Sequence, residues 1–180
     1  MIKNTLNTAK GLLQRDEESI KALMEALVIV GIMMSFAGSS RPASGSEHHL
    51  SHFFEIVGIV NDEPYFSRGI DVAYSTVITS EIREKILISE FPDAIYRLSK
   101  TEYTEKMNKI YNFVANGCIA LQDKVGNYAA DRLSVYKRKE EEIRKILSDT
   151  PSAEEIKTML SIAEIDMEEF YGMYGANALQ

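Results

Sequence analysis

Residues 16–37 read DEESIKALMEALVIVGIMMSFA, and this stretch decides the fold class. Asp16 is a favourable helix N-cap, and the acidic Glu17 and Glu18 that follow it suit the positive end of a helix dipole. The pattern predicts a helix that ends near Phe36. Its later turns are apolar on every side, so we expect the helix to be buried centrally, with its methionines filling the core.

The rest of the 180-residue chain continues the helical periodicity, and no stretch alternates as a strand does. The pattern predicts further helices from residue 44 or 46 to about 58–64, over 68–89, from 92 to 98, over 102–122 and 130–147, and from a start at 150–155, whereas the tail from 170 loses periodicity. The run KRKEEE at 137–142 predicts a solvated face with ion pairs. We therefore predict an all-α protein in which residues 1–180 form a single helical-bundle domain.

Composition excludes several classes of protein. The chain has 20 basic and 27 acidic residues, a net charge of −7, which disfavours sequence-independent nucleic-acid binding. Its longest apolar run, Ala26–Ala37, falls short of the about 20 residues that a membrane-spanning helix needs, and the N-terminus does not resemble a secretory signal. A single cysteine cannot form an internal disulfide. We expect a cytoplasmic protein that binds neither nucleic acid nor membranes.

The candidate functional side chains are concentrated in residues 39–52, which read SSRPASGSEHHLSH and contain all 3 histidines. On a helix His48, His52 and Glu55 share a face, and His49 lies on a neighbouring face that we expect to pack. Two imidazoles one turn apart can bind a metal jointly, or one can bind while the other moves protons. The spacing alone supports equally well two histidines that only form hydrogen bonds in a helical core.

The stretch Leu27–Phe54, in which MSFAG at 34–38 leads into residues 39–52, resembles the C-terminal helical domain of sn-glycerol-1-phosphate dehydrogenase. That family belongs to the iron-containing alcohol dehydrogenase and glycerol dehydrogenase superfamily, which is similar to dehydroquinate synthase. IALQDK at 119–124 and PSAEEI at 151–156 match further on, in the expected order. The resemblance spans most of residues 20–160 and implies the C-terminal fold of dehydroquinate synthase-like proteins.

The resemblance implies an oxidoreductase that uses NADH or NADPH to reduce dihydroxyacetone phosphate to sn-glycerol 1-phosphate, with a zinc or nickel ion polarising the ketone. By this resemblance His48 matches a metal ligand. His52 matches a histidine beside the cofactor and the reacting centre, which makes it the catalytic candidate. The loop before them would line the substrate pocket, where Arg41 and Ser44 suit a phosphate.

The sequence also departs from the family pattern. Arg68 stands where the family has another histidine ligand, and a guanidinium that is always protonated cannot bind a cation. The family's aspartate ligand comes from the boundary with its nucleotide-binding domain, which has no match in this sequence. No glycine-rich phosphate loop follows a strand here either. We therefore expect weak metal binding and no NAD(P)H binding by this chain alone.

Two hypotheses follow. The chain is the C-terminal part of such an oxidoreductase, inactive alone and either self-associated or bound to a separate nucleotide-binding domain. Alternatively, it is a degenerate standalone helical module with an interaction or regulatory role and no catalysis. In the first case we expect an exposed apolar patch of several hundred Å². Tyr171 and Tyr174 near the C-terminus are interpreted as part of a frayed end.

Overall fold

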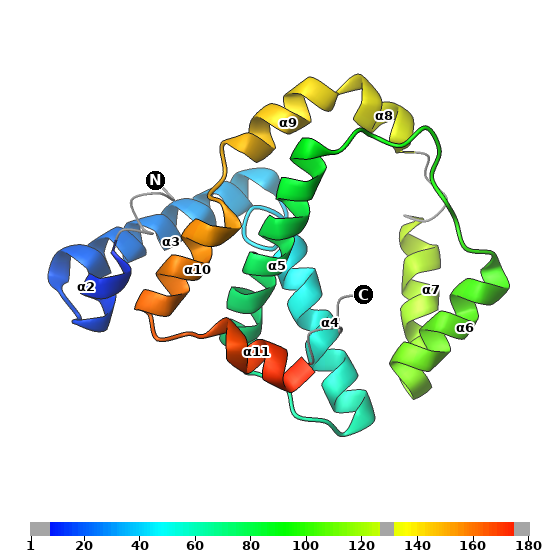
Figure 1. Cartoon of the computed structure of the whole chain (residues 1–180), viewed down its shortest axis with the longest axis horizontal. Helices are drawn as coiled ribbons and strands as arrows, with labels where there is room; N and C mark the ends of the chain where they lie inside the picture. The colour runs from blue at the N-terminus through cyan, green and yellow to red at the C-terminus, as the bar shows by residue number, and fades with distance from the viewer. Residues whose placement is uncertain (1–7, 127–131, 175–180) are drawn as a thin grey trace. The chain divides into compact units, whose positions relative to one another are not determined.

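The computed structural model describes residues 8–126 and 132–174, and within them it contains helices and no strand. This confirms the all-α class, whereas the finer assignment to the dehydroquinate synthase-like fold stays a prediction. Figure 1 shows the helices in chain order: α2 (Ala9–Leu13), α3 (Glu17–Ala37), α4 (Ser46–Asn61), α5 (Arg68–Ile88), α6 (Lys100–Tyr111), the 3-10 turn η1 (Asn112–Val114), α7 (Ala115–Val125), α8 (Leu133–Arg138), α9 (Glu140–Ser148), α10 (Ala153–Ile162) and α11 (Met167–Tyr174).

The chain divides into two compact units. The first, here called unit 1, comprises Met1–His52, Phe66–Glu84 and Pro151–Gln180. Unit 2 comprises Phe53–Tyr65 and Lys85–Thr150. That residues 1–180 fold as one domain therefore stays a prediction, and the two units are described separately below.

Several helix boundaries follow from local sequence signals. Asp16 caps α3, because its side chain accepts a hydrogen bond from the Ser19 amide at 3.1 Å. Hydrogen bonds from the Ser19 side chain and from its amide lower the pKa of Asp16. Gly38 ends α3 in the left-handed conformation at φ 59°, which a glycine adopts without strain. Ser152 starts α10 in a capping box, in which its hydroxyl and the Glu155 carboxylate each accept a bond from the other's amide. The predicted starts of these helices are confirmed.

Helix α3 is not buried, so the prediction that it lies centrally is wrong. Its only buried residue is Ser19. Met24 and Met33, interpreted from the sequence as core residues, are 53% and 52% exposed. By length and composition alone α3 could cross a membrane, but the core helix of a soluble protein and a signal sequence pass the same test. A helix that is apolar on every side can be buried, but its sequence does not identify the surface that would cover it.

Helix α5 provides the interior of unit 1 instead. The residues along its buried face are Asp71, Tyr74, Ser75, Val77, Ile78 and Ser80. Hydroxyl groups on this helix bond back to carbonyls one turn earlier, as Ser80 Oγ does to the Thr76 oxygen at 2.7 Å. These local bonds allow a helix that is much less apolar than α3 to occupy a buried position.

Helices α5 and α10 pack together within unit 1. Val77 contacts Ile156 and Leu160, and the surrounding side chains are Ala73, Met159, Ile165 and Met167. At the edge of this contact Lys157 Nζ donates to Glu81 Oε1 at 2.7 Å, and this hydrogen bond raises the pKa of Lys157. The PSAEE start of α10 is thus placed by an apolar contact and by an ion pair beside it.

Three of the predicted helices differ in extent. Residues 92–98 form no helix, so the expected short helix after Pro92 is absent. The helix expected over 102–122 is interrupted at Asn112, which has φ 45°, and the helix expected over 130–147 is interrupted at Lys139. The beginning of the latter, at 130–131, lies outside the described residues. Ion pairs do form in the 137–142 run and just beyond it, between Lys139 and Glu142 and between Glu140 and Arg144.

Unit 2 contains a pair of packed helices and an arginine that binds the end of α5. Helices α6 and α7 pack against each other (Figure 1), and η1 connects them along the chain. Arg144 of α9 donates to the carbonyl oxygens of Ile86, Leu87 and Ser89 at 2.9, 2.8 and 2.7 Å. Arg144 therefore satisfies carbonyl oxygens at and just beyond the C-terminal end of α5, where a positive charge interacts favourably with the helix dipole. Its guanidinium also lies 5.1 Å from the centre of the Phe91 ring.

Candidate functional site

The candidate site begins with two histidines on the first turns of α4. The rings of His48 and His52 have centroids 5.1 Å apart and lie edge to face at 73°. Both side chains are half-buried. The helical spacing predicted that these two imidazoles share a face, and the structure confirms that they are neighbours.

The third histidine has a different environment. His49 is exposed, so the expectation that it packs is wrong. Phe53, expected on the same face, does pack within unit 2, where its ring centroid is 5.3 Å from that of Phe54 and 6.0 Å from that of Tyr111. His49 is therefore a solvent-facing neighbour of the pair and a suitable control position.

The loop between α3 and α4 carries the two predicted phosphate ligands. Arg41 is exposed and Ser44 is half-buried. Two turns fold this loop: the Ala43 amide donates to the Ser40 oxygen at 2.9 Å, and the Ser44 amide donates to the Arg41 oxygen at 3.4 Å. After these turns the loop 38–45 leads directly into the start of α4, a few residues before His48.

The amino end of α4 has an anion of its own. Glu47 Oε1 accepts a hydrogen bond from the Gly45 amide at 2.9 Å. Glu47 therefore neutralises part of the positive end of this helix. A phosphate bound here would compete with the Glu47 carboxylate for the Gly45 amide. The phosphate site predicted from the sequence did not include this competition.

Arg68 is the first residue of α5, and it is exposed. Within the described ranges 8–126 and 132–174, no three His, Cys, Asp or Glu side chains are grouped so that they could hold a metal ion. His48 and His52 are two donors, and a tight zinc site normally has at least three protein ligands. The described residues by themselves do not fit a complete metal site.

An aromatic cluster that the sequence analysis missed lies at the C-terminal side of unit 1. Phe170 is fully buried, with ring centroids 5.3 Å from Tyr74 and 4.9 Å from Tyr174. The Tyr174 hydroxyl donates to Oδ1 of the buried Asp71 at 3.2 Å and accepts from the Phe66 amide at 3.4 Å. The interpretation of Tyr174 as part of a frayed end is therefore wrong. The signal was present, because Met167, Phe170, Tyr171 and Tyr174 follow the i, i+3, i+4, i+7 spacing of one helix face.

This cluster predicts a loss of stability in alkaline solution. Burial, together with the neighbouring Asp71 charge, raises the pKa of Tyr174 from 10.0 to about 12. An unfolded tyrosine releases its proton near pH 10 and the folded Tyr174 only near pH 12, so stability falls as the pH rises between about 10 and about 12. Tyr74, whose pKa is raised mainly by burial, contributes in the same direction. Melting followed by circular dichroism should show a smaller pH dependence in Tyr174→Phe, and an unchanged slope would exclude Tyr174 as its source.

The sequence matches curated proteins named glycerol-1-phosphate dehydrogenase (NAD(P)+). The protein of Bacillus licheniformis is 34% identical over 76 residues, which are 42% of this chain and 19% of the relative. The protein of Korarchaeum cryptofilum is 40% identical over 81 residues, 45% of this chain and 26% of the relative. The protein of Geobacillus thermodenitrificans is 28% identical over 148 residues, 81% of this chain and 29% of the relative.

This chain thus spans between 19% and 29% of the length of these relatives. No protein-family model matches the sequence, and no solved structure matches it. The resemblance drawn from the sequence motifs is confirmed: the chain is similar to a part of the glycerol-1-phosphate dehydrogenases.

Proposed function

We propose that this chain is the metal- and substrate-binding part of an oxidoreductase similar to glycerol-1-phosphate dehydrogenase. The observation that carries the proposal is the pair of adjacent imidazoles, His48 and His52, directly after the loop 38–45, in a chain that is similar to those enzymes over most of its length. The reaction is the reduction of dihydroxyacetone phosphate. A hydride from NADH or NADPH goes to the carbonyl carbon and a proton goes to its oxygen, which gives sn-glycerol 1-phosphate.

The named residues have separate roles in this proposal. His48 is a metal ligand, and His52 lies beside the reacting centre, where an imidazole can hold or move a proton. Arg41 and Ser44 bind the phosphate of the substrate through a charged and a neutral donor. Since the described residues do not complete a metal site, further ligands have to come from elsewhere.

The nucleotide belongs to another part of the enzyme. The described residues contain no strand that a glycine-rich phosphate loop could follow. We infer that this chain is inactive alone and works together with a nucleotide-binding domain outside these 180 residues. With its net charge of −7 and single cysteine, it is inferred to act in the cytoplasm, without nucleic acid or membrane as partner.

A second candidate function rests on Arg68. A permanent cation at a ligand position, together with the lack of a three-ligand group in the described residues, favours a helical module that has kept an interaction or regulatory role without catalysis. The two functions differ in one observable property, which is whether the chain supports reduction of the substrate once a nucleotide-binding domain is supplied.

The proposal predicts that the isolated chain does not bind NADH or NADPH. The physical reason is that the described residues present no backbone cradle for the pyrophosphate. Isothermal titration of the chain with either dinucleotide should therefore give no saturable heat. One-site binding at micromolar concentration would show that the nucleotide site lies in this chain and would remove the need for a partner domain.

A further inference from the structure

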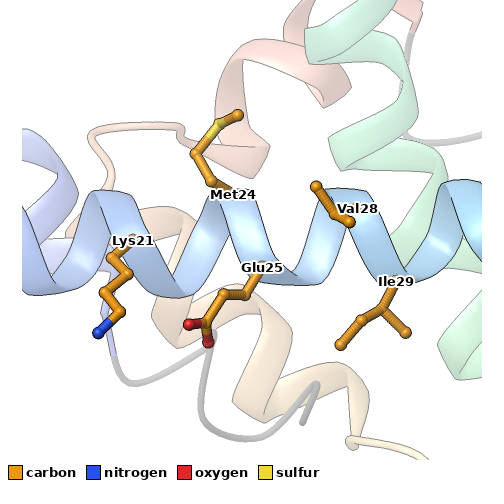
Figure 2. Close-up of a pocket in the computed structure, with 5 residues that line it drawn as sticks. All are labelled: Lys21, Met24, Glu25, Val28 and Ile29. Atoms are coloured by element: carbon orange, nitrogen blue, oxygen red, sulfur yellow. The ribbon is translucent and has the colours of Figure 1, made fainter.

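Two surface features of unit 1 have no role in the proposed function. One is a shallow hollow on α3, and all five of its lining residues belong to that helix: Lys21, Met24, Glu25, Val28 and Ile29. Figure 2 shows Met24 and Val28 on one side of the helix and the other three on the opposite side. The second feature is the Glu47 carboxylate, which is bonded to the last residue of the loop 38–45. Of the two, only the carboxylate brings a charge to the proposed phosphate site.

The Glu47 carboxylate lies directly against Gly45. Its Oε1 accepts a hydrogen bond from the Gly45 amide at 2.9 Å. A Cβ atom added at Gly45 would be 2.6 Å from Glu47 Oε2 and 3.2 Å from Oε1, closer than ordinary contacts allow. The described glycines with a positive φ are Gly38 and Gly126, so the backbone of residue 45 does not itself require glycine. The lack of a side chain at residue 45 is therefore what allows an anion to approach this amide.

The same amide belongs to the loop that carries Arg41 and Ser44. Ser44 precedes Gly45 directly, and its own amide closes a turn on the Arg41 oxygen at 3.4 Å. Within residues 8–126 and 132–174 the Arg41 side chain forms no ion pair. Glu47 therefore binds the backbone of this loop and leaves the guanidinium available to another anion.

We propose that Glu47 is an intramolecular competitor of the substrate phosphate. Its carboxylate occupies the Gly45 amide in the free chain, and a phosphate that binds Arg41 and Ser44 has to displace it. The inference rests on the proposed function, because that phosphate site is part of it.

Displacement of the carboxylate weakens phosphate binding for two reasons. The carboxylate loses a charge-assisted hydrogen bond, and it then stays close to a group of the same charge. Since Glu47 is only two residues from the amide, it competes at a high effective concentration that dilution does not change. The native chain therefore binds a phosphate ester more weakly than Arg41 and Ser44 would by themselves.

The first test removes the competitor by Glu47→Ala. We expect this variant to bind dihydroxyacetone phosphate about tenfold more tightly, since one charge-assisted hydrogen bond corresponds to about that factor in affinity. Isothermal titration of the full chain measures the change. Glu17→Ala is the matched control, because Glu17 is acidic and lies in the first turn of α3 as Glu47 does in that of α4. Unchanged or weaker binding in Glu47→Ala, or an equal gain in Glu17→Ala, would overturn the proposal.

The second test determines whether Glu47 acts through the Gly45 amide. Gly45→Ala places a methyl group against the position of the carboxylate, so it closes the amide to carboxylate and phosphate alike. In this background Glu47→Ala should tighten binding by less than about twofold, because the group for which the two anions compete is no longer accessible. Circular dichroism melting confirms that each variant folds. A tenfold gain in both backgrounds would show that Glu47 acts only through its charge, and it would contradict competition at Gly45.

Inorganic phosphate separates the phosphate group from the rest of the substrate. Its binding should improve in Glu47→Ala by the same factor, because the competition concerns the phosphate alone. A gain confined to dihydroxyacetone phosphate would mean that Glu47 faces another part of the substrate, and the proposal would be wrong.

Failure of the proposed function gives a different result. In that case neither ligand binds to the native chain or to Glu47→Ala, or Arg41→Gln leaves their binding unchanged. Either result would exclude the phosphate site and the competition together. By contrast, binding that depends on Arg41 and is indifferent to Glu47 would exclude the competition alone.

Discussion

Replacing Phe170 by alanine is expected to lower the free energy of unfolding by about 3–5 kcal/mol. Phe170 is fully buried, and its ring lies within contact distance of Tyr74, Tyr171 and Tyr174. The substitution removes the ring and leaves a cavity that three rigid aromatic side chains cannot close. Urea denaturation followed by circular dichroism measures the change directly.

Phe113→Ala is the control for this prediction. Phe113 is 74% exposed, so its truncation should change the free energy of unfolding by less than about 1 kcal/mol. If Phe170→Ala were as mild as Phe113→Ala, α11 would not be part of the core of unit 1. The burial assigned to the aromatic cluster would then be wrong.

Arg68→His is expected to convert weak or absent zinc and nickel binding into measurable binding. A guanidinium cannot donate a lone pair, and a dication about 6 Å from it is repelled by about 5 kcal/mol at an effective dielectric of about 20. Histidine removes this repulsion and restores the donor that the resemblance places there. The measurement is metal content after dialysis, for the native chain and for Arg68→His.

The control for the metal experiment is a histidine substitution in the Arg68→His background. His48→Ala should remove the gained metal, whereas His49→Ala, which changes an exposed neighbour, should not. Stoichiometric metal in the native chain that is lost in His48→Ala would contradict the interpretation of Arg68. It would show that the missing ligands are supplied in a way that tolerates the guanidinium.

Local signals account for the parts of the fold that the sequence predicted. Asp16 and Ser152 start helices because one side-chain oxygen satisfies an amide three residues later, and this bond depends on nothing distant. The exposure of α3 could not be derived in this way, since an apolar helix is buried only where a partner surface covers it, and the periodicity does not identify such a surface. The interruption at Asn112 had a weak signal, because asparagine tolerates positive φ better than most residues.

In the candidate site, too, the local contacts were predicted from the sequence and the others were not. The neighbouring position of His48 and His52 follows from one turn of helix, so the sequence predicted it correctly. The competition of Glu47 for the Gly45 amide was not predicted, because a carboxylate in the first helical turn can face solvent or fold back. The contact of Tyr174 with Asp71 joins residues more than a hundred positions apart, and periodicity contains no information about such pairs.

The most direct test of the central claim is NADH oxidation with dihydroxyacetone phosphate by this chain mixed with the nucleotide-binding domain of a glycerol-1-phosphate dehydrogenase. The account predicts turnover only in the mixture, faster with Arg68→His and added zinc than with the native chain. It also predicts a loss of about a hundredfold or more in His52→Ala and none in His49→Ala. A stable complex in which neither the native chain nor Arg68→His supports oxidation would contradict the claim and would favour a helical module without catalysis.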